Sequence, residues 1–248
     1  MIRMGLDIGG SGMKAALVDT AAGKLVTERV RIPTPADRAP QSMAEVAAQL
    51  VARVAGEGTV GVGMPCVVSG GTARTAANID KAWIGTDTAA LFSGATGRPC
   101  LVANDADVAG LAEMRHGAGR GHDGTVLLLT LGTGIGSALF VDGRLVPNTE
   151  LGHIEVRGKE GERRAAPSVR QDKGLSWKRW AGLLDEYIDA VERLVWPDLI
   201  ILGGGIAKDA DRFVPLLSAR APVAVATFLN SAGIVGAAMF AAESPTRS

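Results

Sequence analysis

The chain has 248 residues, 47% of them hydrophobic and 21% charged, which is enough apolar sequence for one large domain or two modest ones. Its 26 Lys and Arg equal its 26 Asp and Glu, so it lacks the net positive charge of a general nucleic-acid or membrane binder. The two cysteines, Cys66 and Cys100, lie in or beside apolar runs, which indicates buried thiols rather than a disulfide framework or a zinc array.

The chain is predicted to open with three strands, over residues 4–8, 13–18 and 24–32. The first turn reads Asp-Ile-Gly-Gly-Ser-Gly, from Asp7 to Gly12. Glycines in such a turn let backbone N–H groups approach an anion closely, and the Asp7 carboxylate could hold a Mg²⁺ ion that neutralises a phosphate. An ordinary hairpin turn is the alternative interpretation.

A helix with a hydrophobic stripe is predicted after the loop at 33–40, and it ends near Ala55. Ser42 and Glu45 have the spacing of a capping box, which predicts the start of that helix. A strand is expected at 59–64, because that run is apolar and is followed by a proline.

The next loop carries Asn78 and Trp83. A sugar needs hydrogen bonds at its edge and an apolar surface beneath its ring, and an amide beside an exposed Trp would provide both. A structured loop with a packing Trp is the alternative. Thr86 is expected to cap a short helix that ends at Gly94 or Gly97.

Asn104 and Asp105 stand where an apolar strand, 100–103, ends and a helix, 106–116, begins. Strand ends carry catalytic groups because the sheet fixes their position while the loop gives access. A carboxylate held there can take a proton from a substrate hydroxyl. Asn and Asp are also favoured N-caps, so capping is the alternative, and the glycine turns on either side in sequence favour catalysis.

A second strand–turn–strand unit repeats the first. Residues 126–131 form an apolar strand that enters a Gly-Thr-Gly turn, from Gly132 to Gly134, and further strands follow. The two units superpose without a gap at an offset of 123 residues, so that Leu6 matches Leu129. We therefore expect two homologous halves, each a mixed sheet flanked by helices, with a phosphate turn facing a shared cleft.

Glu150 and His153 lie three residues apart beside a glycine, so both can point into the cleft. A lone histidine is often structural, and no metal partner has helical spacing. A sugar-binding or structural role is therefore favoured over a metal-ligand role.

Residues 157–179 form a basic segment, with eight Lys and Arg against three acidic residues. This segment is positive in a chain whose total charge is zero. Local positive charge beside a glycine-lined cleft favours a polyanion, and a solvated surface segment is the alternative.

Ser176 is predicted to cap the longest helix, whose apolar stripe is mostly core and whose exposed part is a candidate dimer face. A buried strand at 198–202 leads into Gly203-Gly204-Gly205. Such a turn can pass beneath a nucleotide base or ribose, or it can simply pack a helix against a strand.

A helix at 209–217, a strand at 223–226 and a closing helix at 232–242 complete the predicted elements. The last of these is too short to cross a membrane, and the N-terminus lacks the apolar core of a signal peptide. We therefore expect a cytoplasmic enzyme.

Five motifs in this order resemble those of the ROK sugar kinases, of the actin-like ATPase superfamily: DIGGSGMKAALVD, the Asn104-Asp105 pair, TLGTGIGS, ELGH and LIILGGGIAKDADRF. TAANIDKAWIGTD, LGHIEV and GLSWKRWAG resemble more narrowly the actinobacterial polyphosphate glucokinases. The resemblance covers nearly the whole chain. It implies an α/β, ribonuclease H-like duplicated fold with two mixed-sheet domains around a cleft. The smaller domain would span 1–103, joined by a closing helix at 231–248, and the larger would span 104–230.

The resemblance implies phosphoryl transfer to the 6-hydroxyl of glucose, with Asp105 as the general base and Mg²⁺ bridging donor oxygens. The residues that would bind the sugar are Asn78, Asn104, Asp105, Glu150, His153 and Glu162. The phosphate-binding residues would be Asp7, Gly9, Gly10, Ser11, Gly12, Lys14, Gly132, Thr133 and Gly134. The turn on the nucleotide side would be Gly203, Gly204 and Gly205.

The basic segment favours inorganic polyphosphate as a donor beside ATP, because a chain of phosphates needs more positive surface than one nucleotide site. Its groove would be formed by Arg163, Arg164, Lys173, Lys178 and Arg179. Many family members carry a zinc-binding Cys cluster after the ELGH-like motif, and 155–170 contains no Cys, so we expect no zinc site. The resemblance also implies a homodimer.

Two alternatives remain open from the sequence. One is an ATP-only kinase of another hexose or amino sugar. The other is a sugar-binding regulator without catalysis, which an intact Asp105 argues against. Neither involves nucleic acid or a membrane.

Overall fold

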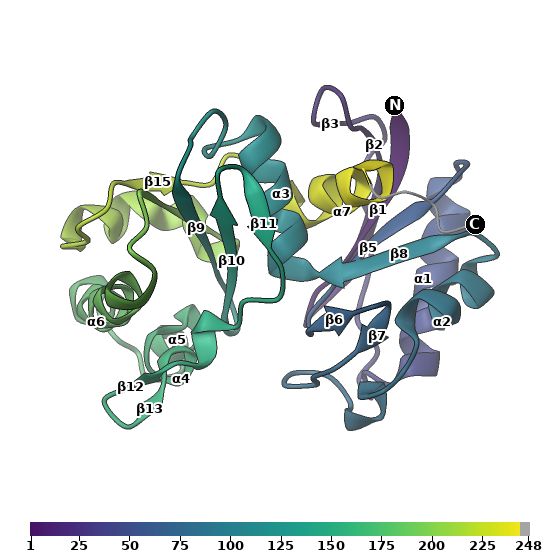
Figure 1. The fold of residues 1–248 in the computed structure, drawn as a ribbon. Helices are drawn as coiled ribbons and strands as arrows, with labels where there is room; N and C mark the ends of the chain where they lie inside the picture. The colour runs from purple at the N-terminus through teal and green to yellow at the C-terminus, as the bar shows by residue number, and fades with distance from the viewer. Residues whose placement is uncertain (244–248) are drawn as a thin grey trace. The chain divides into compact units, whose positions relative to one another are not determined.

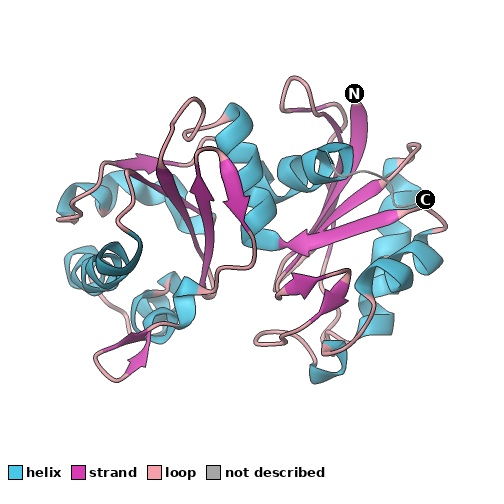
Figure 2. Cartoon of the chain, viewed as in Figure 1, coloured by secondary structure: helices cyan, strands magenta, loops and turns pink. Residues whose placement is uncertain are grey.

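The computed structural model describes residues 1–243, which form two compact units (Figures 1 and 2). The first unit combines Met1–Ala112 with the described residues from Ser231 onward, and the second is Glu113–Asn230. The last five residues of the predicted closing segment, 244–248, lie outside the described part. The units divide inside a helix, between Ala112 and Glu113.

The first unit is built on a six-stranded mixed sheet in the order β3-β2-β1-β5-β8, with β4 also pairing with β2. β1 is antiparallel to β2 and parallel to β5, which is parallel to β8. The strands of this sheet are β1 (Ile2–Ile8), β2 (Met13–Asp19), β3 (Lys24–Leu25), β4 (Val30–Ile32), β5 (Val60–Met64) and β8 (Cys100–Asn104). The single strand predicted at 24–32 is wrong. The Thr27 hydroxyl accepts the N–H of Leu17, which takes the place of a strand partner between β3 and β4.

Helices cover both faces of this sheet. Apolar side chains of β1, including Met4 and Leu6, share a core with Met43 and Leu50 of α1 (Pro40–Val54), beside α2 (Thr88–Thr96). The opposite face is covered by α7 (Ala232–Glu243), which packs along β1 and β5 (Figure 1). The remaining elements of this unit are β6 (Val68–Ser69), β7 (Thr72–Ala73), η1 (Lys81–Trp83) and the first part of α3 (Asp105–His116).

Glycines let α7 approach the strands at backbone distance. A Cβ on Gly5 of β1 would overlap the carbonyl oxygen of Ile234, and one on Gly61 of β5 would overlap that of Ala237. The helix therefore packs against bare backbone, and only small residues satisfy both sides of the contact.

Two helix starts differ from prediction. The capping box is wrong, because Pro40 begins α1 two residues before Ser42, whose hydroxyl instead donates to the Asp37 carboxylate at 2.6 Å. Proline suits the first helical position because the N–H it lacks would have no partner there. Asp87 rather than Thr86 caps α2, accepting the N–H of Ala90 at 2.9 Å.

The second unit has a five-stranded sheet in the order β11-β10-β9-β14-β15. Its strands are β9 (Thr125–Leu131), β10 (Ile135–Val141), β11 (Arg144–Val146), β14 (Leu199–Gly203) and β15 (Val223–Val225). As in the first unit, the central strand has one antiparallel and one parallel neighbour: β9 is antiparallel to β10 and parallel to β14. Strand order and pairing therefore repeat those of the first unit, in agreement with the predicted repeat.

The repeat contains a gap. Leu6 faces Ala15 across the first hairpin, whereas Leu129 faces Ser137, one residue earlier than an offset of 123 requires. The second turn, Gly132 to Gly134, is one residue shorter than the first. The gapless superposition is therefore wrong beyond the turn, because the shorter turn brings the returning strand into register sooner.

Helices of the second unit pack around α6 (Trp177–Val195), which Ser176 caps by accepting the N–H of Arg179 at 3.3 Å. The other elements are η2 (Leu151–His153), β12 (Glu155–Val156), β13 (Lys159–Glu160), α4 (Gly161–Ala165), α5 (Pro167–Asp172), η3 (Gly205–Arg212), η4 (Val214–Leu216) and η5 (Leu229–Ser231). The α-helix predicted at 209–217 is wrong: the segment forms 3₁₀ turns that break at Phe213. Pro215 lacks the N–H that a continuous helix would use there.

Cys66 and Cys100 are free thiols and both are buried, as expected, and burial raises the pKa of Cys100. Within residues 1–243, no helix combines the length and the apolar character needed to span a membrane.

A fully buried carboxylate, that of Glu113, holds the end of α3. It accepts three backbone N–H groups, from Ala118 at 2.9 Å, Thr227 at 3.0 Å and Phe228 at 2.8 Å. Gly117 leaves room for it, because a Cβ there would overlap the carboxylate. Glu113 thus ties the chain after α3 to the segment that precedes η5.

We expect Glu113→Gln to lower the free energy of unfolding by about 2 kcal/mol, because its amide turns one acceptor into a donor that faces buried N–H groups. Glu192→Gln is a matched control with two such bonds, to Arg220 and Ala221, and should cost less. The exposed Glu155→Gln should stay within about 0.5 kcal/mol of wild type.

Urea unfolding gives these free energies, and amide hydrogen exchange of the segment containing Thr227 and Phe228 localises the effect. A Glu113→Gln variant as stable as Glu155→Gln would show that these hydrogen bonds contribute nothing.

Candidate active site

The first glycine turn carries a charged pair at its base. Asp7 near the end of β1 faces Lys14 of β2, and the Lys14 Nζ lies 3.2 Å from the Asp7 Oδ2. Only 16% of the Asp7 side chain and 21% of the Lys14 side chain are exposed. The Gly9 N–H donates to the Gly12 carbonyl at 3.2 Å and closes the turn. A carboxylate and an ammonium are therefore both held beside this turn.

A second cation, Arg31, lies at this turn, and the sequence analysis missed it. Arg31 of β4 stands opposite Lys14 on β2, and its guanidinium donates to the Ser11 carbonyl at 2.7 Å. A Cβ on Gly12 would meet that guanidinium, whereas one on Gly10 would meet no atom within 4 Å. The alternating apolar and polar residues of β4 could have indicated which face of the strand Arg31 occupies. They could place Arg31 at the first glycine turn only once the β2–β4 register was known.

Asn104 and Asp105 stand at the β8–α3 junction, and Asn104 does cap the helix. Its Oδ1 accepts the N–H groups of Ala106 at 2.8 Å and Asp107 at 3.1 Å, while its Nδ2 donates to the Cys66 carbonyl at 3.2 Å. Asn104 is buried, whereas Asp105 is half-buried. Asn104 thus fixes the strand end, and the adjoining Asp105 carboxylate also accepts the Ala106 N–H, at 2.8 Å.

Trp83 is fully buried, so the interpretation of a structured loop with a packing Trp is confirmed, and that of an exposed Trp beneath a sugar is wrong. Its ring stacks on Phe92 and its Nε1 donates to the Arg38 carbonyl at 2.9 Å. Arg38 also donates to the Asn78 carbonyl at 2.9 Å. The loop is therefore built around a packed Trp, and Arg38 holds the exposed Asn78 in place.

The second glycine turn adjoins a carboxylate. Glu162 of α4 accepts the N–H of Ile135 at 3.3 Å, and a Cβ on Gly134 would overlap its Oε2. A Cβ on Gly132 would meet no atom within 4 Å. The structure thus brings the predicted sugar ligand Glu162 onto the predicted phosphate turn, where its charge disfavours a phosphate at Gly134 and leaves the Gly132 side open.

Glu150, His153 and Glu160 form a polar row next to Glu162. The His153 Nε2 lies 3.4 Å from Glu150, and its Nδ1 lies 3.5 Å from Glu160. Ser137 positions this segment, because its hydroxyl accepts the Leu151 N–H at 3.0 Å. Partial burial raises the pKa of Glu150, His153 opposes the rise and Glu162 adds to it.

His153, Glu160 and Glu162 present ligand atoms that all lie within 4.8 Å of one another, so this trio could hold a metal ion. Zinc accepts imidazole and carboxylate ligands, although its structural sites usually have four ligands rich in Cys. The lack of a zinc site remains a prediction.

The third glycine turn is shaped by packing at its middle residue. Gly204 has φ +83°, and a Cβ there would overlap the backbone of Leu131 at the end of β9. A Cβ on Gly205 would meet nothing within 4 Å. The close-packing interpretation therefore holds for Gly204, while Gly205 is open to a ligand.

The basic segment is only partly free of counter-charges. Arg163 pairs with Glu160 at 2.6 Å, and Arg164 and Arg157 both pair with Glu186, at 2.6 and 3.1 Å. Lys173, Lys178 and Arg179 are exposed, and within residues 1–243 they have no ion-pair partner. Positive surface thus remains at the junction of α5 and α6.

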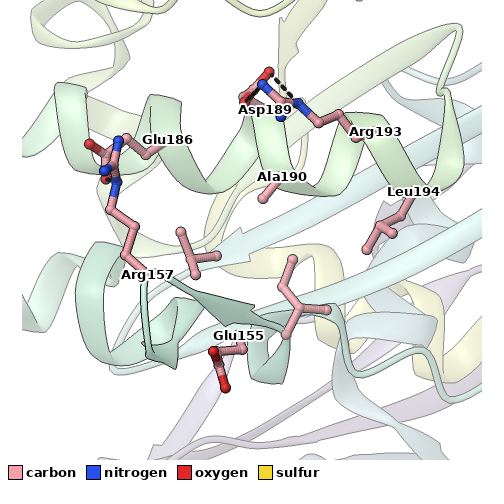
Figure 3. A pocket seen from close by; sticks show the side chains of 9 residues that line it. Glu155, Arg157, Glu186, Asp189, Ala190, Arg193 and Leu194 are labelled. Atoms are coloured by element: carbon pink, nitrogen blue, oxygen red, sulfur yellow. Dashed lines mark hydrogen bonds and ion pairs between the residues drawn. The ribbon is translucent and has the colours of Figure 1, made fainter.

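A pocket of about 660 Å³ lies along the second half of α6 (Figure 3). Its lining residues are Ile154, Glu155, Val156, Arg157, Glu186, Asp189, Ala190, Arg193 and Leu194. Arg157 pairs with Glu186 and Arg193 with Asp189, so most of its charges neutralise one another. No predicted site residue lines it.

Comparison with known proteins identifies the chain. A model of the ROK family matches residues 3–170. The chain is 49% identical over 238 residues to the polyphosphate glucokinase of Mycobacterium tuberculosis, covering 95% of this chain and 89% of that protein. The chain belongs to the ROK family.

Solved structures agree with this assignment. The inorganic polyphosphate/ATP-glucomannokinase from Arthrobacter sp. strain KM has a TM-score of 0.95 and 48% identity to this ROK protein, covering 97% of this chain and 98% of that one. A ROK family glucokinase from Streptomyces griseus, solved with glucose and AMPPNP, has a TM-score of 0.82 at 24% identity, covers 98% and 100%, and is alike in fold. The predicted family and α/β fold class are confirmed.

Gly152, within the motif that carries Glu150 and His153, predicts a stability effect. A Cβ there would overlap the Ile135 carbonyl of β10, which is backbone that cannot move cheaply. We expect Gly152→Ala to lower the free energy of unfolding by about 1–3 kcal/mol. Gly132→Ala is the matched control and should stay within about 0.5 kcal/mol, since its Cβ meets open space. Equal urea midpoints for the two variants would contradict the packing argument.

Proposed function

We propose that this ROK protein transfers a phosphoryl group from inorganic polyphosphate, and from ATP, to the 6-hydroxyl of glucose. The observation that carries the proposal is the 49% identity to a polyphosphate glucokinase over 95% of the chain. Similarity to a polyphosphate/ATP-glucomannokinase at 48% identity supports the use of both donors. A coupled assay for glucose 6-phosphate, run in parallel on ATP and on nucleotide-free polyphosphate, tests it. Turnover with neither donor would overturn it.

Asp105 is the proposed general base. Its carboxylate would accept the proton of the 6-hydroxyl as that oxygen attacks the terminal phosphorus of the donor, and the bond from phosphorus to the leaving phosphate would break. Asn104 supports this role by capping α3, which fixes the backbone from which Asp105 projects. Such a reaction depends on positioning and charge neutralisation more than on covalent chemistry.

Two sets of residues would position the substrates. The proposed ligands of the sugar are Asn78, Asn104, Glu150, His153 and Glu162. The donor phosphates are assigned to the turn from Asp7 to Gly12 with Lys14, and to Gly132 and Thr133 of the second turn, away from Glu162 at Gly134, with Gly203 to Gly205 on the nucleotide side. Lys14 and Arg31 supply the positive charge at the first turn.

Asp7 is the proposed protein ligand of Mg²⁺. Mg²⁺ is commonly held by one or two carboxylates together with donor phosphates and waters, and one mostly buried carboxylate beside an open glycine turn fits that pattern. Bound there, the ion would neutralise charge on the donor. Lys14 would lie beside the bound ion, because its Nζ is 3.2 Å from the same carboxylate.

Mannose is a second candidate acceptor, because the Arthrobacter protein at 48% identity is a glucomannokinase.

A homodimer in the cytoplasm is also part of the proposal. The end of α6 supports a dimer face, since Leu194 and Trp196 are each 64% exposed. Light scattering after size exclusion measures the oligomeric state.

We expect Asp105→Asn to lower kcat by on the order of 10²-fold or more, the scale of a lost general base. The fold should survive, because Asn104 rather than Asp105 supplies the main cap. Asp123→Asn, in an exposed loop, controls for loss of a negative charge. A folded Asp105→Asn enzyme with kcat near that of wild type would remove Asp105 from the chemistry.

Charge reversal at Lys173 and Lys178 tests the groove. We expect Lys173→Glu with Lys178→Glu to raise the KM for polyphosphate more than the KM for ATP, because a longer polyanion reaches more of the positive surface. Lys24→Glu with Arg53→Glu makes the same charge change on exposed positions of the first unit. Equal effects on the two donors would exclude these lysines from the donor site.

A further inference from the structure

Two arginines of the second unit converge on one indole ring. Trp177 opens α6, and its ring stacks on Phe213 with a 9° interplanar angle and 6.1 Å between centroids. The Cζ of Arg170 lies 3.7 Å from the centroid of the Trp177 ring, and that of Arg212 lies 4.7 Å from it. Because both distances share one centroid, the two guanidinium carbons are at most 8.4 Å apart, the sum of the two.

These two cations lack counter-charges. Within residues 1–243, neither Arg170 nor Arg212 has a carboxylate at ion-pair distance, although Asp172 and Asp211 lie near them in sequence. The other arginines of the basic segment that approach α6 do have such partners, as Arg164 does in Glu186. Like charges brought together without a carboxylate repel each other, so this pair is suited to an anion.

The same cluster contains two buried donors without an acceptor. The Nε of Arg170 and the Nε1 of Trp177 are both buried and have no hydrogen-bond partner in the described part of the chain. Buried donors in native proteins nearly always have partners, and a missing ion or water is one explanation of an exception. This observation adds to the charge argument, because both donors belong to side chains of the same cluster.

Both arginines come from elements anchored at glycine turns. Ser168 of α5, two residues before Arg170, donates its hydroxyl to the Thr133 carbonyl at 2.6 Å. η3, which ends at Arg212, begins beside Gly204, where the backbone touches Leu131 at the end of β9. A phosphate chain that enters at the Gly132 turn would therefore have this pair within the same unit.

We propose that Arg170 and Arg212, held against Trp177, form an anion site that binds phosphoryl groups of polyphosphate beyond the one transferred. The inference rests on the proposed function. Guanidinium groups suit it because their planar N–H forks bind phosphate oxygens in pairs and their faces stack on an aromatic ring. Arg170 was outside the predicted groove residues, and Arg212 lies outside the basic segment altogether.

The test uses Arg170→Gln with Arg212→Gln, and the matched control is Arg220→Gln. Arg220 also stacks on an indole, with its Cζ 3.9 Å from the Trp196 ring centroid, but as a single cation. We expect the double variant to weaken binding of sodium tripolyphosphate, measured by calorimetry without glucose, by about tenfold or more. Its ratio of the KM for polyphosphate to the KM for ATP should rise by a similar factor.

Arg170→Lys with Arg212→Lys keeps both charges and loses the forks, so it should recover only part of the affinity. Tripolyphosphate binding and a KM ratio equal to those of Arg220→Gln would overturn the site while leaving the proposed function intact. A wild-type chain that turns over no polyphosphate would refute the proposed donor instead, and the calorimetric comparison would still decide whether the arginine pair binds phosphate.

Discussion

The packing of α7 on bare backbone is the constraint on which the first unit depends. Gly5 and Gly61 let the helix reach β1 and β5, and the helix in turn uses Gly233 where a Cβ would meet the Asp7 carboxylate. One face of Asp7 is thus closed by α7, while its Oδ2 holds Lys14. The C-terminal helix α7, which covers this face of the sheet, therefore also fixes the Asp7 carboxylate that is proposed to hold Mg²⁺.

The two halves share a strand order, but their glycine turns differ electrostatically. The first turn has Lys14 and Arg31 beside it, whereas the second has Glu162 against Gly134. A phosphate is favoured beside the first set of charges, and a sugar hydroxyl or a cation beside the second. The two turns therefore share a repeated strand arrangement but differ in charge. Arg31 of β4 is positive at the first turn, and Glu162 of α4 is negative at the second.

Some of the site followed from local sequence. The glycine turns, the Asn104-Asp105 pair at a strand end and the cap at Ser176 depend on neighbours a few residues apart, and all occur at the expected elements. The capping box and the exposed Trp failed for one shared reason. Ser42 donates its hydrogen bond to the Asp37 carboxylate, and Trp83 donates its own to the Arg38 carbonyl. Local residue preferences do not predict which of several competing hydrogen-bond partners a side chain takes.

The sequence by itself determined the family, the class of fold and the chemistry of the side chains available, because motif order and apolar periodicity are local properties. Only the tertiary structure decided which groups meet. Arg31 reaches the first turn through strand register, Glu162 reaches Gly134 through helix packing, and Arg170 and Arg212 meet over Trp177 from segments 42 residues apart. These long-range contacts depend on turn lengths, strand registers and the packing of helices on the sheet. Each contact forms only when the rest of the structure has fixed the backbone positions of its two residues.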